Sequence, residues 1–266
     1  MSILKRNNVK VCGRGPIPML FAHGYGCDQK MWRLVTPAFE NDYRVVLFDH
    51  VGAGGSDLAA FSPAKYANLK GYAQDVLEIC RELDLQNVEF VGHSVSSMIG
   101  LLAAVEEPSR FADLIMIGPS PCYIDDPGYK GGFSRADIEG LLDFLDSNYL
   151  GWSTTMAPVI MGNPERPELS EELTNSFCRT DPEIAKQFAR VTFLSDNRED
   201  LPRLTVPSLI LQCDVDAIAP LPVGTYLHSR LPESSLRFLK ATGHCPQLSA
   251  PEETIREMKN YLAMKN

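Results

Sequence analysis

Continuous apolar segments of strand length alternate along this chain with segments of helical pattern. A strand that is apolar at every position is buried on both faces, as in a parallel sheet covered by helices on each side. Segments 69–85, 96–108 and 251–265 carry helical spacing, and Pro108 ends the second of them. The pattern therefore predicts an α/β fold with a mostly parallel sheet. The predicted strands lie within residues 19–26, 43–50, 88–93, 111–121, 206–216 and 234–244.

Residues 123–195 interrupt this alternation, because they contain no clear buried strand. Helical patterns occur instead at 134–152 and 181–196. One interpretation is a helical cap inserted between two parts of an α/β core, 1–122 and 196–266; the other is a set of ordinary crossover helices. A length of about seventy residues without a strand favours the cap.

Charge and cysteine usage exclude several classes of protein. The formal net charge of −9 gives no electrostatic attraction for nucleic acid or anionic membrane, and disfavours a highly anionic substrate. The chain has no apolar run long enough for a membrane span and no pattern of a signal peptide, so we expect a cytoplasmic protein. Seven scattered cysteines without a CxxC motif indicate free thiols. No HExxH or similar spacing occurs, so we expect no metal and no cofactor.

The segment Gly92-His93-Ser94-Val95-Ser96 follows one of the predicted strands and precedes a predicted helix. A nucleophilic serine at such a turn usually lies in the motif G-x-S-x-G, and here Ser96 replaces the last glycine. Serine is small, so it weakens the motif without excluding the tight turn. The alternative is that Ser94 is simply the N-cap of the following helix.

An aspartate and a histidine follow two later strands and complete a candidate triad with Ser94. A serine hydroxyl needs a base to accept its proton and an acid to orient that base. Asp216 follows the strand segment 206–215 and His244 follows 234–243, and the carboxyl ends of parallel strands lie at one edge of a sheet. The order Ser, Asp, His is that of α/β-hydrolases. Asp214 is the alternative acid; we prefer Asp216 because it directly precedes the apolar turn Ala-Ile-Ala-Pro.

A glycine-rich loop after the first strand is placed to supply part of an oxyanion hole. We expect the amides of Tyr25, in this loop, and Val95, after the serine, to be its donors. Cys27 and Cys245 lie close in sequence to the predicted site. The remaining histidines have simpler roles: His23 orders the loop, His50 is structural, His93 lines the site and His228 lies on the surface.

Motifs along nearly the whole chain resemble α/β-hydrolases of the RsbQ type, which are bacterial energy-stress regulators, and the related plant karrikin and strigolactone receptors. The resemblance rests on FAHGYGCDQKMW, VVLFDHVGAGGSD, FVGHSVSSMIG, GPSPCYIDDPGYKGGF, FCRTDPEIAKQFA, VPSLILQCDVDAIAP and GHCPQLSAPEETI. The plant receptors also carry serine at the position of Ser96. One departure is Gln247, where relatives often have histidine, and we expect it to affect the pocket rim or a partner surface.

The resemblance implies the triad Ser94, Asp216 and His244, an oxyanion hole of Tyr25 and Val95, and a V-shaped cap of four helices over a hydrophobic cavity. Aromatic residues of the cap region are the candidate substrate contacts, although plain packing between cap helices would equally explain them. With His93, the candidate substrate-binding residues are Tyr123, Phe133, Trp152 and Phe193.

The resemblance further implies slow hydrolysis of a small, apolar, uncharged ester or butenolide-like ligand in the service of signalling. The implied partner is a serine/threonine phosphatase of a general stress pathway, and the implied oligomeric state is a monomer. Two other hypotheses remain: a receptor that signals by binding alone, and a metabolic carboxylesterase without a partner.

Overall fold

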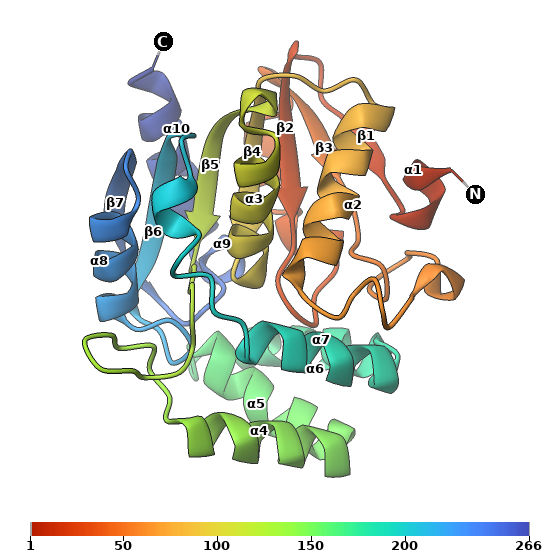
Figure 1. Ribbon diagram of the computed structural model, residues 1–266, viewed down its shortest axis with the longest axis vertical. Coiled ribbons are helices and arrows are strands. Elements are labelled where there is room, and N and C mark those ends of the chain that lie inside the picture. The colour runs from red at the N-terminus through yellow and green to blue at the C-terminus, as the bar shows by residue number, and fades with distance from the viewer. Residues whose placement is uncertain (1, 266) are drawn as a thin grey trace.

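The computed structural model describes residues 2–265, and the strands of that part form one twisted sheet (Figure 1). The strand order is β1-β3-β2-β4-β5-β6-β7; β1 runs antiparallel to β3, and the other neighbours are parallel. This confirms the α/β-hydrolase fold expected from the sequence. The strands are β1 (Lys10–Cys12), β2 (Ile17–Ala22), β3 (Tyr43–Leu47), β4 (Val88–His93), β5 (Phe111–Ile117), β6 (Ser208–Val215) and β7 (Ser234–Thr242).

The continuous apolar runs are explained by burial of both sheet faces. In β2, Met19 and Phe21 belong to one core cluster, whereas Leu20 and Ala22 belong to a second cluster on the other face. Successive side chains of a strand point to opposite faces, so both sets must be apolar. One face is covered by α2 (Leu69–Glu82), α3 (Val95–Glu106) and α8 (Leu221–Arg230), and the other by α9 (Pro246–Ser249) and α10 (Pro251–Ala263).

Four helices lie between β5 and β6 and form a layer across the carboxyl end of the parallel strands (Figure 1). They are α4 (Arg135–Ser147), α5 (Tyr149–Met161), α6 (Pro167–Arg179) and α7 (Pro182–Phe193). The segment 134–152, expected as one helix, is two, because Asn148 leaves the helical conformation and its side chain caps α5 by accepting from the Gly151 amide. The four-helix layer therefore covers the sheet edge at which the predicted site lies.

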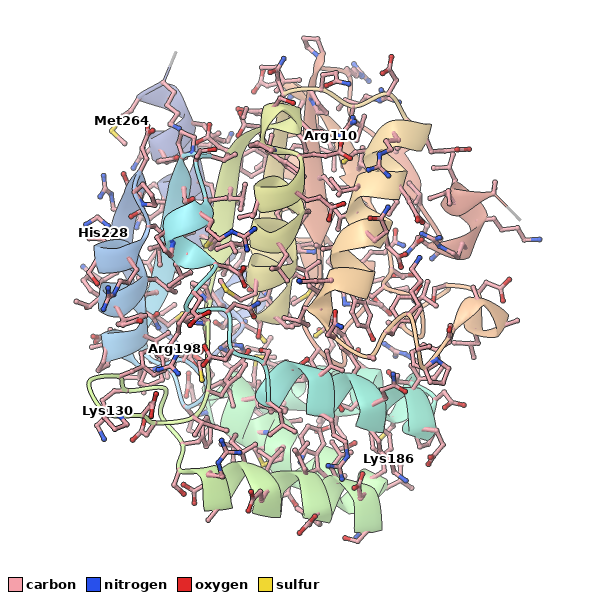
Figure 2. All side chains as sticks on the ribbon, in the orientation of Figure 1. Arg110, Lys130, Lys186, Arg198, His228 and Met264 are labelled. Carbon is pink, nitrogen blue, oxygen red and sulfur yellow. The ribbon has the colours of Figure 1, made fainter. Side chains whose placement is uncertain are left out.

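The two connections between this layer and the sheet are bonded to each other. Cys122 and Asp196 form an isolated antiparallel bridge, and the Asn197 amide donates to the Pro121 carbonyl at 2.7 Å. Arg198, seen beside the loop that carries Lys130 in Figure 2, forms ion pairs with Asp126 and Asp196. The entering and leaving segments thus make a common base for the four helices.

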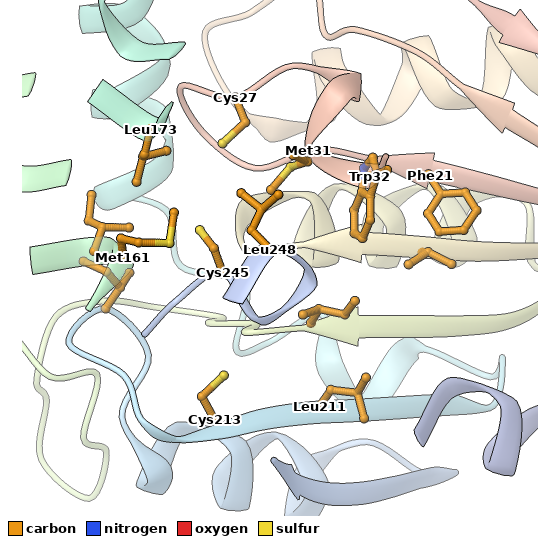
Figure 3. Close-up of a cluster of buried hydrophobic side chains, with 14 of the residues drawn as sticks. Phe21, Cys27, Met31, Trp32, Met161, Leu173, Leu211, Cys213, Cys245 and Leu248 are labelled. Atoms are coloured by element: carbon orange, nitrogen blue, oxygen red, sulfur yellow. The ribbon is translucent and has the colours of Figure 1, made fainter. Parts of the chain in front are cut away.

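The apolar core is continuous from the sheet into the four-helix layer. Figure 3 shows one cluster, in which Phe21 of β2 and the neighbouring Trp32 are followed by Leu248 and then by Met161 and Leu173 of the layer. The cysteines of the chain are free thiols. Among residues 2–265, no helix is long and apolar enough to cross a membrane.

Several short elements were not expected from the sequence. Strand β1 has only three residues, two of them exposed, and therefore has no apolar run to reveal it. The N-terminal helix α1 (Ile3–Arg6) is a single turn capped by Ser2. Short 3₁₀ helices occur at Gln29–Trp32, Thr36–Ala38, Leu58–Ala60, Pro108–Arg110 and Leu201–Arg203.

Candidate active site

Ser94 occupies a strained turn between β4 and α3. Its φ of 55° and ψ of −124° lie in a region that residues with a side chain rarely adopt. A Cβ at Gly92 would lie 2.6 Å from the Ser96 carbonyl oxygen, so the first glycine of the motif is required for the turn to close. The strand and helix thereby meet at a sharp angle, with the Ser94 side chain at the apex.

Ser94, His244 and Asp216 form one hydrogen-bonded chain. His244 Nε2 lies 2.7 Å from Ser94 Oγ, and His244 Nδ1 lies 2.7 Å from Asp216 Oδ2. The second carboxylate oxygen of Asp216 accepts the amides of Ile218 at 2.8 Å and Ala219 at 3.1 Å. The structure thus brings together the three residues predicted as catalytic, each with the partner that the sequence prediction assigned to it.

The environment of Asp216 keeps its carboxyl ionised. Burial acts to raise the pKa of Asp216, but interaction with His244 and the hydrogen bonds from His244, Ile218 and Ala219 outweigh it and lower the pKa. Asp214, the alternative acid, is exposed at the end of β6, and the carboxylate bonded to His244 among the described residues is that of Asp216. The acid in contact with the imidazole is therefore Asp216.

The main chain of His244 is held from two sides. His93 Nε2 donates to the His244 carbonyl at 2.7 Å, and the His244 amide donates to the Ile160 carbonyl in the last turn of α5 at 2.8 Å. Burial, and secondarily the proximity of the His244 imidazole, lowers the pKa of His93 to about 3, so this histidine is neutral. Gly118 leaves room for the imidazole, since a Cβ there would come within 3.2 Å of it.

The two predicted oxyanion donors are amides without acceptors. Val95 is the first residue of α3, so its N–H has no acceptor within the helix. The Tyr25 amide makes no hydrogen bond to any group among residues 2–265. The two segments are in direct contact, because a Cβ at Gly24 would lie 3.3 Å from the Ser94 Cβ. Free amides on both sides of a serine are the arrangement that an oxyanion hole requires.

A largely apolar cavity opens onto Ser94 and His244 beneath the four-helix layer. The cavity is narrow, with a volume of about 30 Å³. Of the predicted substrate contacts, His93, Tyr123 and Phe193 line this cavity. The other wall residues are Tyr25, Cys27, Ile160, Leu173, Phe177, Thr192, Ile218 and Cys245.

Trp152 and Phe133, also predicted as substrate contacts, do not belong to the cavity wall. Trp152 is fully buried and packs against Tyr25 and Phe177, with ring centroids at 6.0 and 5.3 Å, so it supports the wall from behind. Phe133 is half-buried, and its amide bonds to the Tyr123 carbonyl. In place of these two, α6 contributes Leu173 and Phe177, whose i,i+4 spacing on one apolar helix face was the available signal.

A second serine–histidine pair lies next to the first. His50 Nε2 is 2.8 Å from Ser96 Oγ, but Ser96 Oγ also donates to the His23 carbonyl at 2.5 Å. His50 Nδ1 has no hydrogen-bond partner, so no carboxylate orients or charges this imidazole. Neither residue lines the cavity. This pair therefore lacks the acid and the access that a nucleophilic serine needs.

The other residues noted in the sequence analysis, His228, Cys27, Cys245 and Gln247, lie where none of them can act as a nucleophile or a base toward Ser94. His228 is exposed at the outer end of α8 (Figure 2). Cys27 and Cys245 face the cavity, but burial raises the pKa of the Cys27 thiol to about 12 and that of Cys245 well above its usual value. Gln247, expected at a pocket rim or partner surface, is instead fully buried in α9.

Fold and site together define a hydrolase of the α/β type, and comparison with known proteins agrees. The Alpha/beta hydrolase family profile matches residues 19–257. The chain is 38% identical over 256 residues to karrikin insensitive 2 receptor IA of Petunia hybrida, covering 96% of this chain and 93% of that protein. It is 37% identical over 262 residues to strigolactone esterase D14 of Arabidopsis thaliana, covering 98% of each. The chain belongs to the α/β-hydrolase family.

Among solved structures, a hydrolase from Oleispira antarctica superposes with a TM-score of 0.96 at 44% identity, covering 98% of this chain and 96% of that one. An enol-lactonase from Burkholderia xenovorans superposes with a TM-score of 0.83 at 18% identity, covering 96% and 95%. The latter likeness concerns the fold alone. Membership of the family supports hydrolase activity for this chain.

Proposed function

We propose that this protein is a serine hydrolase that slowly cleaves a small hydrophobic ester or butenolide-like lactone for signalling. The observation that carries the proposal is the chain Ser94–His244–Asp216, which ends with its serine hydroxyl at a covered apolar cavity. The proposal selects Ser94 over Ser96 as nucleophile because only the histidine of Ser94 is bonded to a carboxylate.

The geometry supports a two-step acyl transfer. Ser94 Oγ attacks the carbonyl carbon while His244 Nε2 takes its proton, and Asp216 stabilises the imidazolium that forms. The carbonyl oxygen becomes an oxyanion and accepts hydrogen bonds from the Tyr25 and Val95 amides, each worth about 10²–10³ in rate. His244 then protonates the leaving oxygen. A water molecule, deprotonated by the same imidazole, releases the acyl group from Ser94.

The cavity supports a small, uncharged ligand. Apolar side chains form most of its wall, and its polar groups include the hydroxyls of Tyr123 and Thr192, neither of which has a hydrogen-bond partner among residues 2–265. A ligand with one or two polar oxygens in an apolar frame would match this wall. The named activities of the plant relatives, a strigolactone esterase and karrikin receptors, support a butenolide as the first ligand to test.

We further propose that residues 123–195 act as a cap whose arrangement reports the state of the cavity. The hydrogen bond from the His244 amide to the Ile160 carbonyl supports this role, because it links the catalytic loop to α5. Following the resemblance to RsbQ-type regulators, the partner would be a serine/threonine phosphatase of a stress pathway, acting on a monomeric cytoplasmic hydrolase.

The test uses intact-protein mass spectrometry with wild type, Ser94→Ala and Ser208→Ala. Ser208 is a buried serine at the opposite end of β6 and serves as the matched control. We expect a fluorophosphonate adduct on Ser94 in wild type and control, and none in Ser94→Ala. With p-nitrophenyl acetate, Ser94→Ala should lose about 10³-fold or more in kcat.

A synthetic strigolactone distinguishes the three hypotheses. A slow signalling hydrolase should give a persistent adduct on Ser94 or His244. A receptor that signals by binding should show the same ligand-induced thermal shift in wild type and Ser94→Ala. Rapid ester turnover without a butenolide reaction would indicate a metabolic carboxylesterase, and an unlabelled Ser94 would overturn the triad.

A further inference from the structure

The side chain of Ser96, at the position where the nucleophile motif usually has glycine, takes part in a buried network of hydrogen bonds. Ser96 is fully buried at the start of α3. Its hydroxyl donates to the His23 carbonyl at 2.5 Å and lies 2.8 Å from His50 Nε2. Because the only hydroxyl proton is used on His23, His50 Nε2 must be the donor in the second bond.

The other contacts of this network fix both histidine tautomers. The His50 amide donates to His23 Nε2 at 3.1 Å, so that nitrogen carries a lone pair. The His23 proton is therefore on Nδ1, which donates to the Gly24 carbonyl at 2.8 Å. Burial lowers the pKa of His23, and burial together with the nearby His23 lowers that of His50 well below its usual value. Both imidazoles are neutral, as this arrangement of protons requires.

The network ends on the peptide unit that carries one oxyanion donor. The Gly24 carbonyl and the Tyr25 amide belong to the same peptide group, and in a trans peptide they point in opposite directions. The Gly24 oxygen is held by His23 Nδ1 and, at 3.3 Å, by the Cys27 amide. The hydrogen bonds that the Gly24 carbonyl oxygen accepts therefore set the direction in which the free Tyr25 N–H points.

We propose that Ser96 is a positioning residue for the oxyanion hole: its hydroxyl joins the helix behind the nucleophile to the loop that presents the Tyr25 amide. This inference rests on the proposed function, since it assigns the Tyr25 amide to the oxyanion. Ser96 touches neither the cavity nor Ser94 Oγ, and acts through His23 and His50. Ser96 thus has a role of its own at the position where the G-x-S-x-G motif has its last glycine.

Loss of the hydroxyl would leave two buried groups without partners. The His23 carbonyl would lose its donor and His50 Nε2–H its acceptor, in a cluster where the His50 ring is fixed against Phe48, Tyr72 and Phe188. Unpaired buried groups favour rearrangement or entry of water. Either change would alter the angle at which the Tyr25 amide meets the developing oxyanion.

The experiment compares Ser96→Gly and Ser96→Ala with wild type and the control Ser208→Ala. The kcat for p-nitrophenyl acetate is measured per site counted by complete fluorophosphonate labelling, so unfolded protein does not enter the rate. The inhibition constant of a trifluoromethyl ketone, which mimics the tetrahedral oxyanion, is measured in parallel. Thermal melts record any loss of stability separately.

We expect kcat to fall about 10- to 100-fold in both Ser96 variants, less than or comparable to deletion of an oxyanion donor. KM should stay within about twofold, and the inhibition constant should rise by the same factor as kcat/KM falls, because the lost interaction acts on the transition state. Ser208→Ala should match wild type.

Ser96→Gly is decisive because it restores the usual motif. If small size is all that the position requires, this variant will equal or exceed wild type in kcat and bind the ketone equally well, and the inference is overturned. A fall in thermal stability with unchanged kcat per labelled site would also overturn it. Failure of the proposed function is distinguishable, because fluorophosphonate would then leave Ser94 unlabelled in the wild-type protein.

Discussion

At the scale of single residues, Asp214 and Asp216 show why a strand end is difficult to interpret from sequence. Positions i and i+2 of a regular strand share one face, so periodicity alone places both carboxylates together. The register between β6 and β7 shifts between Cys213 and Val215, and this irregularity leaves Asp214 exposed while Asp216 meets His244. The apolar turn after Asp216 was the available sequence signal, because its amides bind the second carboxylate oxygen.

Exchange of each aspartate for asparagine tests this assignment. In Asp216→Asn, the neutral amide can no longer stabilise the imidazolium by its charge or hold the Nδ1–H tautomer through a charged acceptor, so kcat for p-nitrophenyl acetate should fall about 10³–10⁴-fold. Asp214→Asn is the matched control, and its kcat should stay within about twofold of wild type. A larger loss in Asp214→Asn than in Asp216→Asn would show that the loop rearranges during catalysis and exchanges the two acids.

The grouping of Ser94, Asp216 and His244 could be predicted from sequence because each follows a strand within two residues, and strands that belong to one parallel sheet end at one edge. The cavity wall could not be predicted to the same degree. Trp152 and Phe177 are both large, buried and on helices of the layer, yet only Phe177 faces the cavity. The rotation of each helix about its axis decides this, and that rotation depends on packing between helices that are distant in sequence.

At the scale of elements, Arg198 adds a side-chain link to the main-chain bonds at the base of the four-helix layer. Arg198 binds both carboxylate oxygens of Asp196, pairs with Asp126 at 3.0 Å and lies over the Tyr129 ring at 4.9 Å. A planar guanidinium is suited to paired contacts and ring stacking at the same time. Tyr129 in turn donates to the Cys122 carbonyl, so the loop after β5 and the segment before β6 are joined through this side chain.

Replacement of Arg198 by alanine should loosen the base of the layer more than it destabilises the whole protein. The two aspartates are about half exposed, so the loss in unfolding free energy should be about 1 kcal/mol or less. Amide hydrogen exchange should accelerate in residues 121–133 and 194–198 and remain unchanged in the sheet. Arg203→Ala, which removes an exposed arginine paired only with Asp200, is the control. Equal exchange in both variants would show that Arg198 does not join the two connections.

The strands that could be predicted from the sequence are those with a continuous apolar run. The six strands expected from apolar runs are β2 to β7, whereas β1 pairs through main-chain bonds at an exposed edge and carries no such run. The break between α4 and α5 escaped detection because Asn148 separates two helical patterns without glycine or proline. The sequence alone does not show that the Asn148 side chain caps the start of α5, because asparagine also occurs within helices.

At the scale of the whole molecule, the two ends of the sheet contain different charged groups. Ser94, Asp216 and His244 lie at the carboxyl end, and a buried pair of carboxyls, Glu89 and Asp113, occupies facing positions near the amino ends of β4 and β5. Asp113 binds Tyr261 and Lys265 of the C-terminal segment, whereas one oxygen of Glu89 has no partner. Burial, followed by the charge of Asp113, raises the pKa of Glu89 to about 7 against the attraction of Lys265.

This raised pKa makes the stability of the protein depend on pH in a defined direction. Between the unfolded value of 4.5 and the folded value of about 7, the folded protein binds the extra proton, so this contribution to stability is lost as pH rises through that interval. Glu89→Gln should therefore raise the unfolding free energy at pH 8 by roughly 3 kcal/mol and change it little at pH 4.5. Denaturant unfolding of wild type and variant at the two pH values measures the difference directly.

Glu82→Gln, at an exposed position in the last turn of α2, controls for loss of one negative charge and should give no such change between pH 4.5 and 8. A Glu89→Gln effect of equal size at both pH values would show instead that the carboxyl is already ionised throughout, and that the unpaired oxygen acts through packing alone.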